Sequence, residues 1–190
     1  GRLSYTKREQ EETVQHLRQL EGISGCILLS TCNRTELIIS YESGWKADEK
    51  ELFCGLKGLS AEEYGSYIHE RRGMEAVRDI FSLAGGLKSQ ILGEDQILTQ
   101  MKDAADFSRQ FFGTDKILET LFRMAVTAGK EVKTRIKLPS ANRSAPLAAI
   151  TGLEQEGENF CGEKCLVIGN GVMGRMTAQL LLDRGADVTV

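Results

Sequence analysis

The sequence predicts a mixed α/β protein: a small α/β sandwich, then a helical subdomain, then the start of a βαβ unit. Three observations predict this order. Short apolar runs alternate with helical patterns over residues 1–72, helical periodicity alone fills 73–140, and a strand, a glycine-rich turn and a helix follow within 141–190. We therefore expect a substrate-binding part over 1–140 and a second domain from 141.

The first part opens with an amphipathic helix over 7–20, because Thr6 and Glu9 have the spacing of a capping box before a run of helical periodicity. Apolar runs at 26–30 and 36–41 are typical of buried strands, and polar residues separate them. Helices are expected at 48–58 and after Ser60, and a strand at 67–70. This part is the α/β sandwich.

Helical patterning then continues over 74–84, 95–112 and 115–137. The glycines at 85–94 do not suit a rigid helix, so we expect a polar loop or kink there. Pro139 marks a break, after which a helix is expected at 146–156 and an apolar strand at 164–168. A second helix to Arg184 and a strand from Asp187 follow, and this last unit is expected to be incomplete at Val190.

Composition excludes several classes of protein. The longest apolar runs fall short of the roughly 18 residues of a membrane helix, and the polar N-terminus lacks the apolar core of a signal peptide. Five cysteines, an odd number, argue against a disulfide framework. With two histidines and no paired ligand spacing, we expect no metal site. A cytoplasmic protein is the simplest interpretation.

The net charge of −3 gives no global attraction to nucleic acid, but basic residues gather between 123 and 143. This stretch holds a single acid, Glu131, against six basic residues: Arg123, Lys130, Lys133, Arg135, Lys137 and Arg143. A solvated helix face is the ordinary interpretation of such a run. A stripe that contacts phosphates is the alternative.

A G-x-G-x-x-G pattern at Gly169, Gly171 and Gly174 follows a predicted strand and opens a predicted helix. In that context the first glycine permits a tight turn, the second lets backbone amides approach a pyrophosphate, and the third lets helix and strand pack closely. A purely structural turn is the alternative. The pattern predicts a Rossmann-type NAD(P)-binding domain, and the residue that would select NAD or NADP is expected about 20 residues further on.

Cys32 lies between the two expected strands of the first part, in the segment Thr31-Cys32-Asn33-Arg34. Most free cysteines are small buried hydrophobes. Here a nearby guanidinium would favour the thiolate, and polar neighbours inside an apolar strand pair need partners or solvent. A reactive thiol is therefore the functional interpretation.

Three segments together resemble the glutamyl-tRNA reductase family over nearly the whole chain. They are Leu29-Ser30-Thr31-Cys32-Asn33-Arg34-Thr35-Glu36-Leu37, the stretch from Gly86 to Leu98, and the stretch from Leu166 to Gly174. The resemblance implies NADPH-dependent reduction of glutamyl-tRNA to glutamate-1-semialdehyde, the first step of tetrapyrrole (heme) synthesis, with Cys32 as nucleophile and a thioester intermediate. It also implies a homodimer and a downstream aminomutase as a possible partner.

The same resemblance implies which residues bind the glutamyl group and the cofactor. The substrate-binding residues would be Thr31, Asn33, Arg34, Ser89, Glu94, Asp95, Gln96 and Gln100. From residue chemistry alone, Ser89, Glu94, Gln96 and Gln100 are better explained as exposed or capping groups than as ligand-binding groups. The cofactor-binding residues would be Gly169, Asn170, Gly171, Val172, Met173 and Gly174.

The sequence departs from the family's pattern at two positions. Asp79 stands where the family typically carries a histidine, and Lys88 replaces an acidic residue just before Ser89. An aspartate accepts a proton but rarely donates one at neutral pH. The alternative is therefore a catalytically weakened paralogue that binds glutamyl-tRNA or a nicotinamide nucleotide in a regulatory role.

Overall fold

The computed structural model describes residues 2–31, 33–88, 96–111, 114–136 and 144–190. Their elements follow in the order α1 (Lys7–Leu17), β1 (Ile23–Ser30), β2 (Thr35–Tyr41), α2 (Glu49–Leu56), α3 (Ala61–Tyr64), the 3-10 helix η1 (Gly65–Tyr67), α4 (Gly73–Ala84), α5 (Gln96–Phe111), α6 (Lys116–Arg135), α7 (Ala145–Gln155), β3 (Lys164–Leu166), α8 (Val172–Leu182) and β4 (Asp187–Thr189). They form two compact units, one of residues 1–85 and 96–132, the other of 86–95 and 133–190. The domain boundary predicted near 140 falls outside the described residues.

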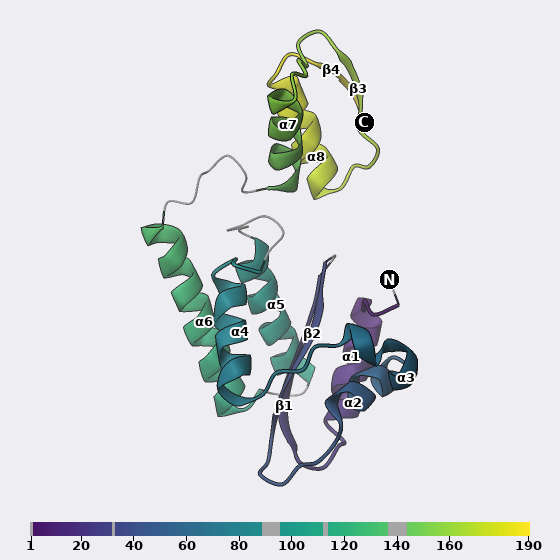
Figure 1. Ribbon diagram of the computed structural model, residues 1–190, viewed down its shortest axis with the longest axis vertical. Coiled ribbons are helices and arrows are strands. Elements are labelled where there is room, and N and C mark those ends of the chain that lie inside the picture. Colours follow the sequence, from purple (N-terminus) through teal and green to yellow (C-terminus); the bar gives the residue numbers. More distant parts are fainter. Residues whose placement is uncertain (1, 32, 89–95, 112–113, 137–143) are drawn as a thin grey trace. The chain divides into compact units, whose positions relative to one another are not determined.

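The first unit is built around an antiparallel hairpin of β1 and β2, with Ile23 opposite Tyr41 at one end and Ser30 opposite Thr35 at the other. Figure 1 shows α1, α2 and α3 on one side of this hairpin and α4, α5 and α6 on the other. Strand side chains alternate between faces, so a strand covered on both sides is apolar throughout. This explains why residues 26–29 are all buried, and it confirms the mixed α/β class.

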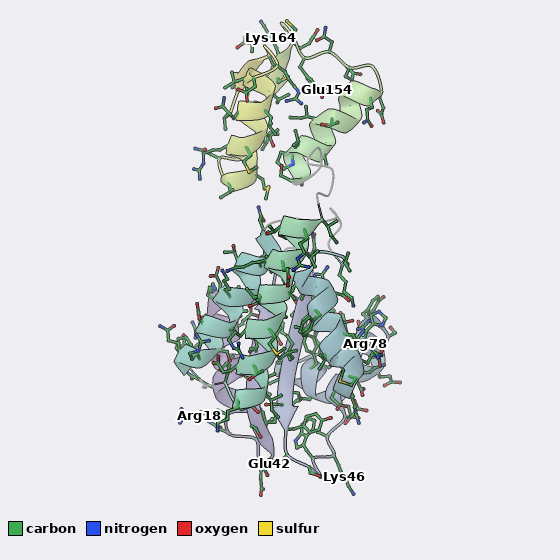
Figure 2. All side chains as sticks on the ribbon, turned by 90° about the vertical axis from the view of Figure 1, so that its left-hand side faces the viewer. Arg18, Glu42, Lys46, Arg78, Glu154 and Lys164 are labelled. Carbon is green, nitrogen blue, oxygen red and sulfur yellow. The ribbon has the colours of Figure 1, made fainter. Side chains whose placement is uncertain are left out.

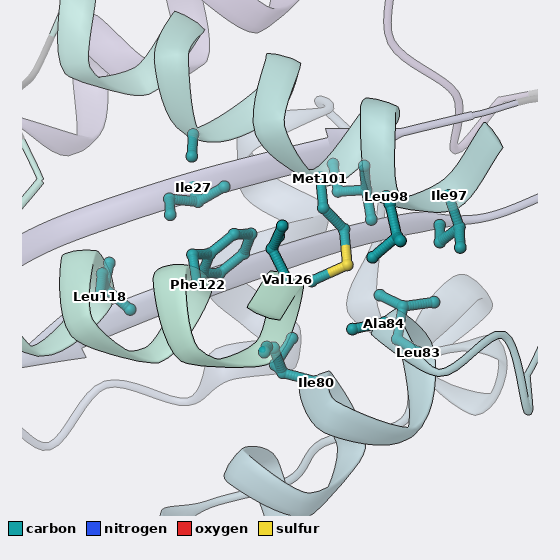
Figure 3. Packing of buried hydrophobic residues seen from close by; sticks show 13 residues of the cluster. Ile27, Ile80, Leu83, Ala84, Ile97, Leu98, Met101, Leu118, Phe122 and Val126 are labelled. Atoms are coloured by element: carbon teal, nitrogen blue, oxygen red, sulfur yellow. The ribbon is translucent and has the colours of Figure 1, made fainter. Parts of the chain in front are cut away.

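The main core lies between the hairpin and the three long helices. Figure 3 shows Ile27 of β1 next to Phe122 of α6, and Met101 of α5 near Leu83 of α4, all within one cluster. Each is at most 3% exposed. Burying a side chain of this size stabilises a fold by roughly 1.5–3 kcal/mol. Helical periodicity correctly predicted that these segments form helices.

Local signals fixed where the early helices begin. The predicted capping box is present, because Thr6 Oγ1 accepts from Glu9 N at 3.3 Å and Glu9 Oε2 accepts from Thr6 N at 2.7 Å. Asp48 caps α2 by accepting from the backbone N–H groups of residues 50 and 51. Ser60 precedes α3 as predicted, although its side chain makes no capping hydrogen bond.

The strand predicted at 67–70 is wrong. Tyr67 ends the 3-10 helix η1, and residues 68–72 are neither helix nor strand. A strand needs a neighbour for its backbone hydrogen bonds, and among the described residues β1 and β2 pair only with each other. Ion pairs anchor this segment instead: Arg72 binds Glu49 and Glu70, and Arg71 binds Asp79.

The second unit contains two parallel strands joined through α8. Lys164 of β3 lies opposite Asp187 of β4, and α7 packs with α8 around a core that includes Ile150 and Leu181. This is the predicted βαβ arrangement, although β3 ends at Leu166, before the predicted Ile168. Among the described residues, no helix has both the length and the hydropathy to cross a membrane.

Low pH should weaken the ion pair that links α1 to the end of α2. Lys57 Nζ lies 2.7 Å from Glu9 Oε1, and this bond, with those from Thr6, lowers the pKa of Glu9 from its ordinary value of 4.5 to about 2. A carboxyl group whose pKa is lowered in the folded state stabilises the fold at pH values above its ordinary pKa. This stabilisation is lost as the pH falls toward the folded-state pKa. We expect Glu9→Gln to lower stability at pH 7 and to make unfolding less dependent on pH between 4.5 and 2.

Urea unfolding at pH 2–7 measures this. The matched control is Glu12→Gln, because Glu12 pairs with Arg8 where both side chains are more than half exposed. We expect little change from that substitution. Equal pH profiles for Glu9→Gln and the unsubstituted protein would contradict the prediction.

Candidate functional site

The turn between β1 and β2 is held by the side chain of Thr31. The Thr31 backbone N–H donates to the Arg34 carbonyl at 2.8 Å. Thr31 Oγ1 accepts from Asn33 N at 3.3 Å and from Arg34 N at 3.2 Å. The hydroxyl therefore satisfies two backbone donors that the strand ladder leaves unpaired. Cys32, the predicted nucleophile, belongs to this turn in the sequence but lies outside the described residues.

Arg34 places a guanidinium next to the turn. Its Nη1 lies 3.2 Å from Glu36 Oε1, and the two side chains are 21% and 24% exposed. Alternation along β2 puts Arg34 and Glu36 on the same face as Ile38, which packs against the main core. A guanidinium is a planar fork of five N–H donors, which suits bidentate recognition of a carboxylate. Asn33 is exposed.

A network under the turn was not predicted from the sequence. Ser30 Oγ accepts from Tyr5 N at 3.2 Å and lies 3.4 Å from Thr35 Oγ1, at the last paired position of the hairpin. Lys57, 9% exposed at its side chain, donates to the Ser4 carbonyl at 2.9 Å and sits 4.3 Å from the centre of the Tyr5 ring. The segment before α1 thus braces the base of the turn. In the sequence, this network was indicated only by a polar serine at the end of an apolar strand.

Gln96 and Gln100 lie in the first two turns of α5, one helical turn apart and half-buried. At the other end of α5, Ser108 Oγ donates to the Cys26 carbonyl near the start of β1. Figure 1 shows α5 running opposite to β1. From Ser108, the two glutamines lie about 12–18 Å away toward the N-terminus of α5. From Cys26, Thr31 lies about 16 Å away toward the C-terminus of β1. Both glutamines therefore lie at the end of the unit that carries the turn.

The remaining predicted substrate residues, Ser89, Glu94 and Asp95, lie outside the described residues. Asp79, at the position of the family histidine, is described. Its Oδ1 lies 2.7 Å from Arg71 Nε, and its side chain is 16% exposed. The carboxylate is thus engaged in an ion pair between α4 and the segment before it.

The described cysteines differ in accessibility. Cys26 and Cys54 are buried. Burial raises the pKa of Cys26 to about 12 and raises the pKa of Cys54. Both thiols are therefore protonated at neutral pH and poor nucleophiles. Cys161 is exposed and Cys165 is half-buried, and among the described residues no three His, Cys, Asp or Glu side chains are grouped to hold a metal ion.

The glycine-rich turn of the second unit has the geometry that its pattern predicted. Gly169 has φ +118°, a conformation that favours glycine. Gly171 precedes α8 with no side-chain cap, so the first backbone N–H groups of the helix stay available to an anion. A Cβ on Gly174 would fall on the Gly169 carbonyl oxygen and lie 2.8 Å from its carbon. Asn170, Val172 and Met173 are exposed beside them. These residues fit a dinucleotide's pyrophosphate.

We expect Gly174→Ala to displace α8 from the turn and weaken nucleotide binding by about tenfold or more, because the clash is with rigid backbone. Gly152→Ala is the matched control, since a Cβ there meets open space in α7 of the same unit. Fluorescence titration with NADPH measures both. Equal affinity of the two variants would contradict the role given to the third glycine.

Comparisons with known proteins agree with these motifs. Residues 1–136 match the model of the family described as glutamyl-tRNAGlu reductase, N-terminal domain. A glutamyl-tRNA reductase of Acetivibrio thermocellus is 41% identical, covering 100% of this chain and 56% of the relative. A probable multifunctional siroheme biosynthesis protein HemA of Ruminiclostridium josui is 39% identical over 100% of this chain and 37% of its own length.

A solved structure, glutamyl-tRNA reductase from Methanopyrus kandleri, matches 98% of this chain and 44% of its own, with a TM-score of 0.61 and 32% identity. This similarity agrees with the mixed α/β fold. The chain spans about half the length of the relatives that it matches.

Proposed function

The chain belongs to the glutamyl-tRNA reductase family, and on that premise we propose that the intact protein reduces glutamyl-tRNA to glutamate-1-semialdehyde with NADPH. This is the entry reaction of tetrapyrrole synthesis by the route from glutamate. The turn held by Thr31 carries the proposal, because the sequence of this turn contains Cys32 and ends at Arg34. A cytoplasmic homodimer that passes its product to an aminomutase completes the proposal.

Cys32 acts as the nucleophile. Its sulfur attacks the ester carbonyl of the glutamyl group, a C–S bond forms, the C–O bond to the terminal ribose breaks, and tRNA leaves with its hydroxyl restored. The product is a thioester, which is a better hydride acceptor than an ester. Addition of hydride to the thioester carbonyl and cleavage of the C–S bond give the aldehyde and regenerate the thiol.

Substrate recognition falls to the polar groups around the turn. Arg34 offers the planar fork that suits a carboxylate, and its bond to Glu36 fixes the orientation of the guanidinium. Gln96 and Gln100 supply amide donors and acceptors from the same end of the unit. Thr31 and Asn33, and Ser89, Glu94 and Asp95 from the family pattern, complete the proposed set.

The second unit supplies the cofactor site. Residues 169–174 and the N-terminal amides of α8 would hold the pyrophosphate. The bound reduced nicotinamide supplies the hydride. The positive φ of Gly169 and the close approach of Gly174 support this assignment.

One observation favours a second function, that of a weakened paralogue which binds glutamyl-tRNA or a nicotinamide nucleotide in regulation. Asp79 replaces the family histidine, and its carboxylate is paired with Arg71. A carboxylate held in this ion pair is not positioned as an imidazole would be, and an aspartate side chain differs from histidine in its chemistry. If the histidine's proton chemistry is required, this chain lacks it at that position.

Trapping the thioester separates the two functions. The intact protein is mixed with glutamyl-tRNA labelled in the glutamate, without NADPH, and denatured in acid. We expect about one label per chain, released by hydroxylamine and mapped to the peptide of Cys32. Cys161→Ser, which removes an exposed thiol, is the matched control and should retain the label. A folded protein that binds tRNA and forms no adduct would favour the regulatory function.

A further inference from the structure

One face of α6 carries a regular row of cations and hydroxyls. The row comprises Lys116, Thr120, Arg123, Thr127 and Lys130. All five are exposed. Steps of four and three residues keep such side chains on one side of a helix, so the row runs straight for about 21 Å. We call these five residues the α6 stripe.

The α6 stripe lies opposite the buried side of its helix. Leu118, Phe122 and Ala125 are at most 3% exposed and pack into the main core. Figure 1 shows α6 at the outer edge of its helical layer, and the view in Figure 2 faces that edge. Within the first unit the stripe is therefore exposed along the length of the helix.

Positive charge predominates on this helix. Glu119, the acid of its first turn, is engaged by Arg109, whose Nε and Nη2 donate to it at 2.9 and 3.0 Å. Further along α6, Glu131 is one acid among four basic residues: Arg123, Lys130, Lys133 and Arg135. The helix thus concentrates positive charge on a chain whose net charge is −3.

We propose that the α6 stripe is a docking surface for the phosphate backbone of the tRNA. This rests on the proposed function and names the surface through which that substrate is held. Lys, Arg and Thr side chains are common phosphate ligands, and such contacts position a nucleic acid without reading its sequence. The Thr127 hydroxyl already donates to the Arg123 carbonyl, so the cations carry most of the affinity. The helix is rigid because its other side is core.

The test neutralises the three cations in the intact protein: Lys116→Gln, Arg123→Gln and Lys130→Gln together. Glutamine keeps the helix propensity. The matched control neutralises three exposed cations elsewhere on the first unit, Arg18, Lys46 and Arg78, which Figure 2 labels. Binding of unacylated tRNA is measured by fluorescence anisotropy over a range of KCl concentrations, and circular dichroism checks the fold of both variants.

We expect the stripe variant to bind roughly tenfold or more weakly at low salt. The slope of log affinity against log salt should fall by about one for each phosphate that the variant no longer neutralises. The control should keep the original slope. If the stripe variant binds tRNA like the unsubstituted protein, the proposed docking surface is overturned. It is also overturned if the unsubstituted protein binds no tRNA.

Unacylated tRNA keeps this test separate from the chemistry. A protein that binds tRNA through the stripe but forms no thioester would overturn the proposed reduction and support the stripe. If the unsubstituted protein forms semialdehyde and the stripe variant keeps the original salt slope, the proposed reduction is supported and the α6 stripe is overturned.

Discussion

Cys32→Ser should lower the rate of semialdehyde formation by roughly 10⁴-fold or more while tRNA binding persists, because removing a covalent nucleophile has effects of this order. Serine keeps the size and the hydrogen-bonding capacity of the side chain. Its hydroxyl is a much weaker nucleophile near pH 7 than a thiol, and an ester formed on it is no easier to reduce than the substrate. The loss should therefore appear in kcat.

The readouts are semialdehyde release, label retained after acid denaturation, and affinity for unacylated tRNA. Cys26→Ser is a poor comparison, since Cys26 is fully buried. Cys161→Ser is the matched control because that thiol is exposed and lies in the other unit. Turnover by Cys32→Ser close to that of the unsubstituted protein would exclude the thioester mechanism.

Gly129→Ala should destabilise the first unit by about 3 kcal/mol, toward the upper end of the cost of overpacking a core. Gly129 lies in α6 where that helix crosses the end of α4. A Cβ there would clash with the Ala84 carbonyl oxygen and would lie 2.9 Å from the Ala84 carbonyl carbon and 2.8 Å from Leu98 Cδ2. Backbone atoms cannot rotate away as a side chain can, so the helices must separate and the core must open.

Gly55→Ala is the matched control for this prediction. Gly55 also lies within a helix of the first unit, but a Cβ there meets nothing within 4 Å. Alanine is the better helix former, so we expect a gain of about 0.5–1 kcal/mol. Thermal and urea unfolding measure both variants. A loss at Gly129 no larger than the change at Gly55 would show that the helices can part without cost.

Most of the secondary structure was predictable because local chemistry governs it. The capping box at Thr6 and Glu9, the periodicity of α4, α5 and α6, and the glycine turn at 169–174 each depend on residues close in sequence. The predicted strand at 67–70 was wrong for a non-local reason. The mixture of polar and apolar residues at 67–70 is compatible with an extended chain. A strand forms, however, only where another strand offers hydrogen-bonding groups.

The candidate site divides in the same way. Cys32, Arg34 and the glycine turn could be selected from the sequence because reactive or conformationally unusual residues stand out in their local setting. The brace formed by Tyr5, Ser30 and Lys57 could not, since Tyr5 N and Ser30 Oγ are 25 residues apart in the chain. The pairing of Asp79 with Arg71 was equally invisible. The site residues themselves stay predictions.

The sequence by itself determined the helices, the hairpin strands and the residues whose chemistry points to a thiol and a nucleotide site. Only the tertiary structure decided how the turn that carries Cys32 is held, which carboxylates are engaged by distant cations, and that one row of α6 is exposed. The physical reason is range. Capping, periodicity and turn conformation act over a few residues, whereas burial and ion pairing depend on which distant segments come together when the core forms.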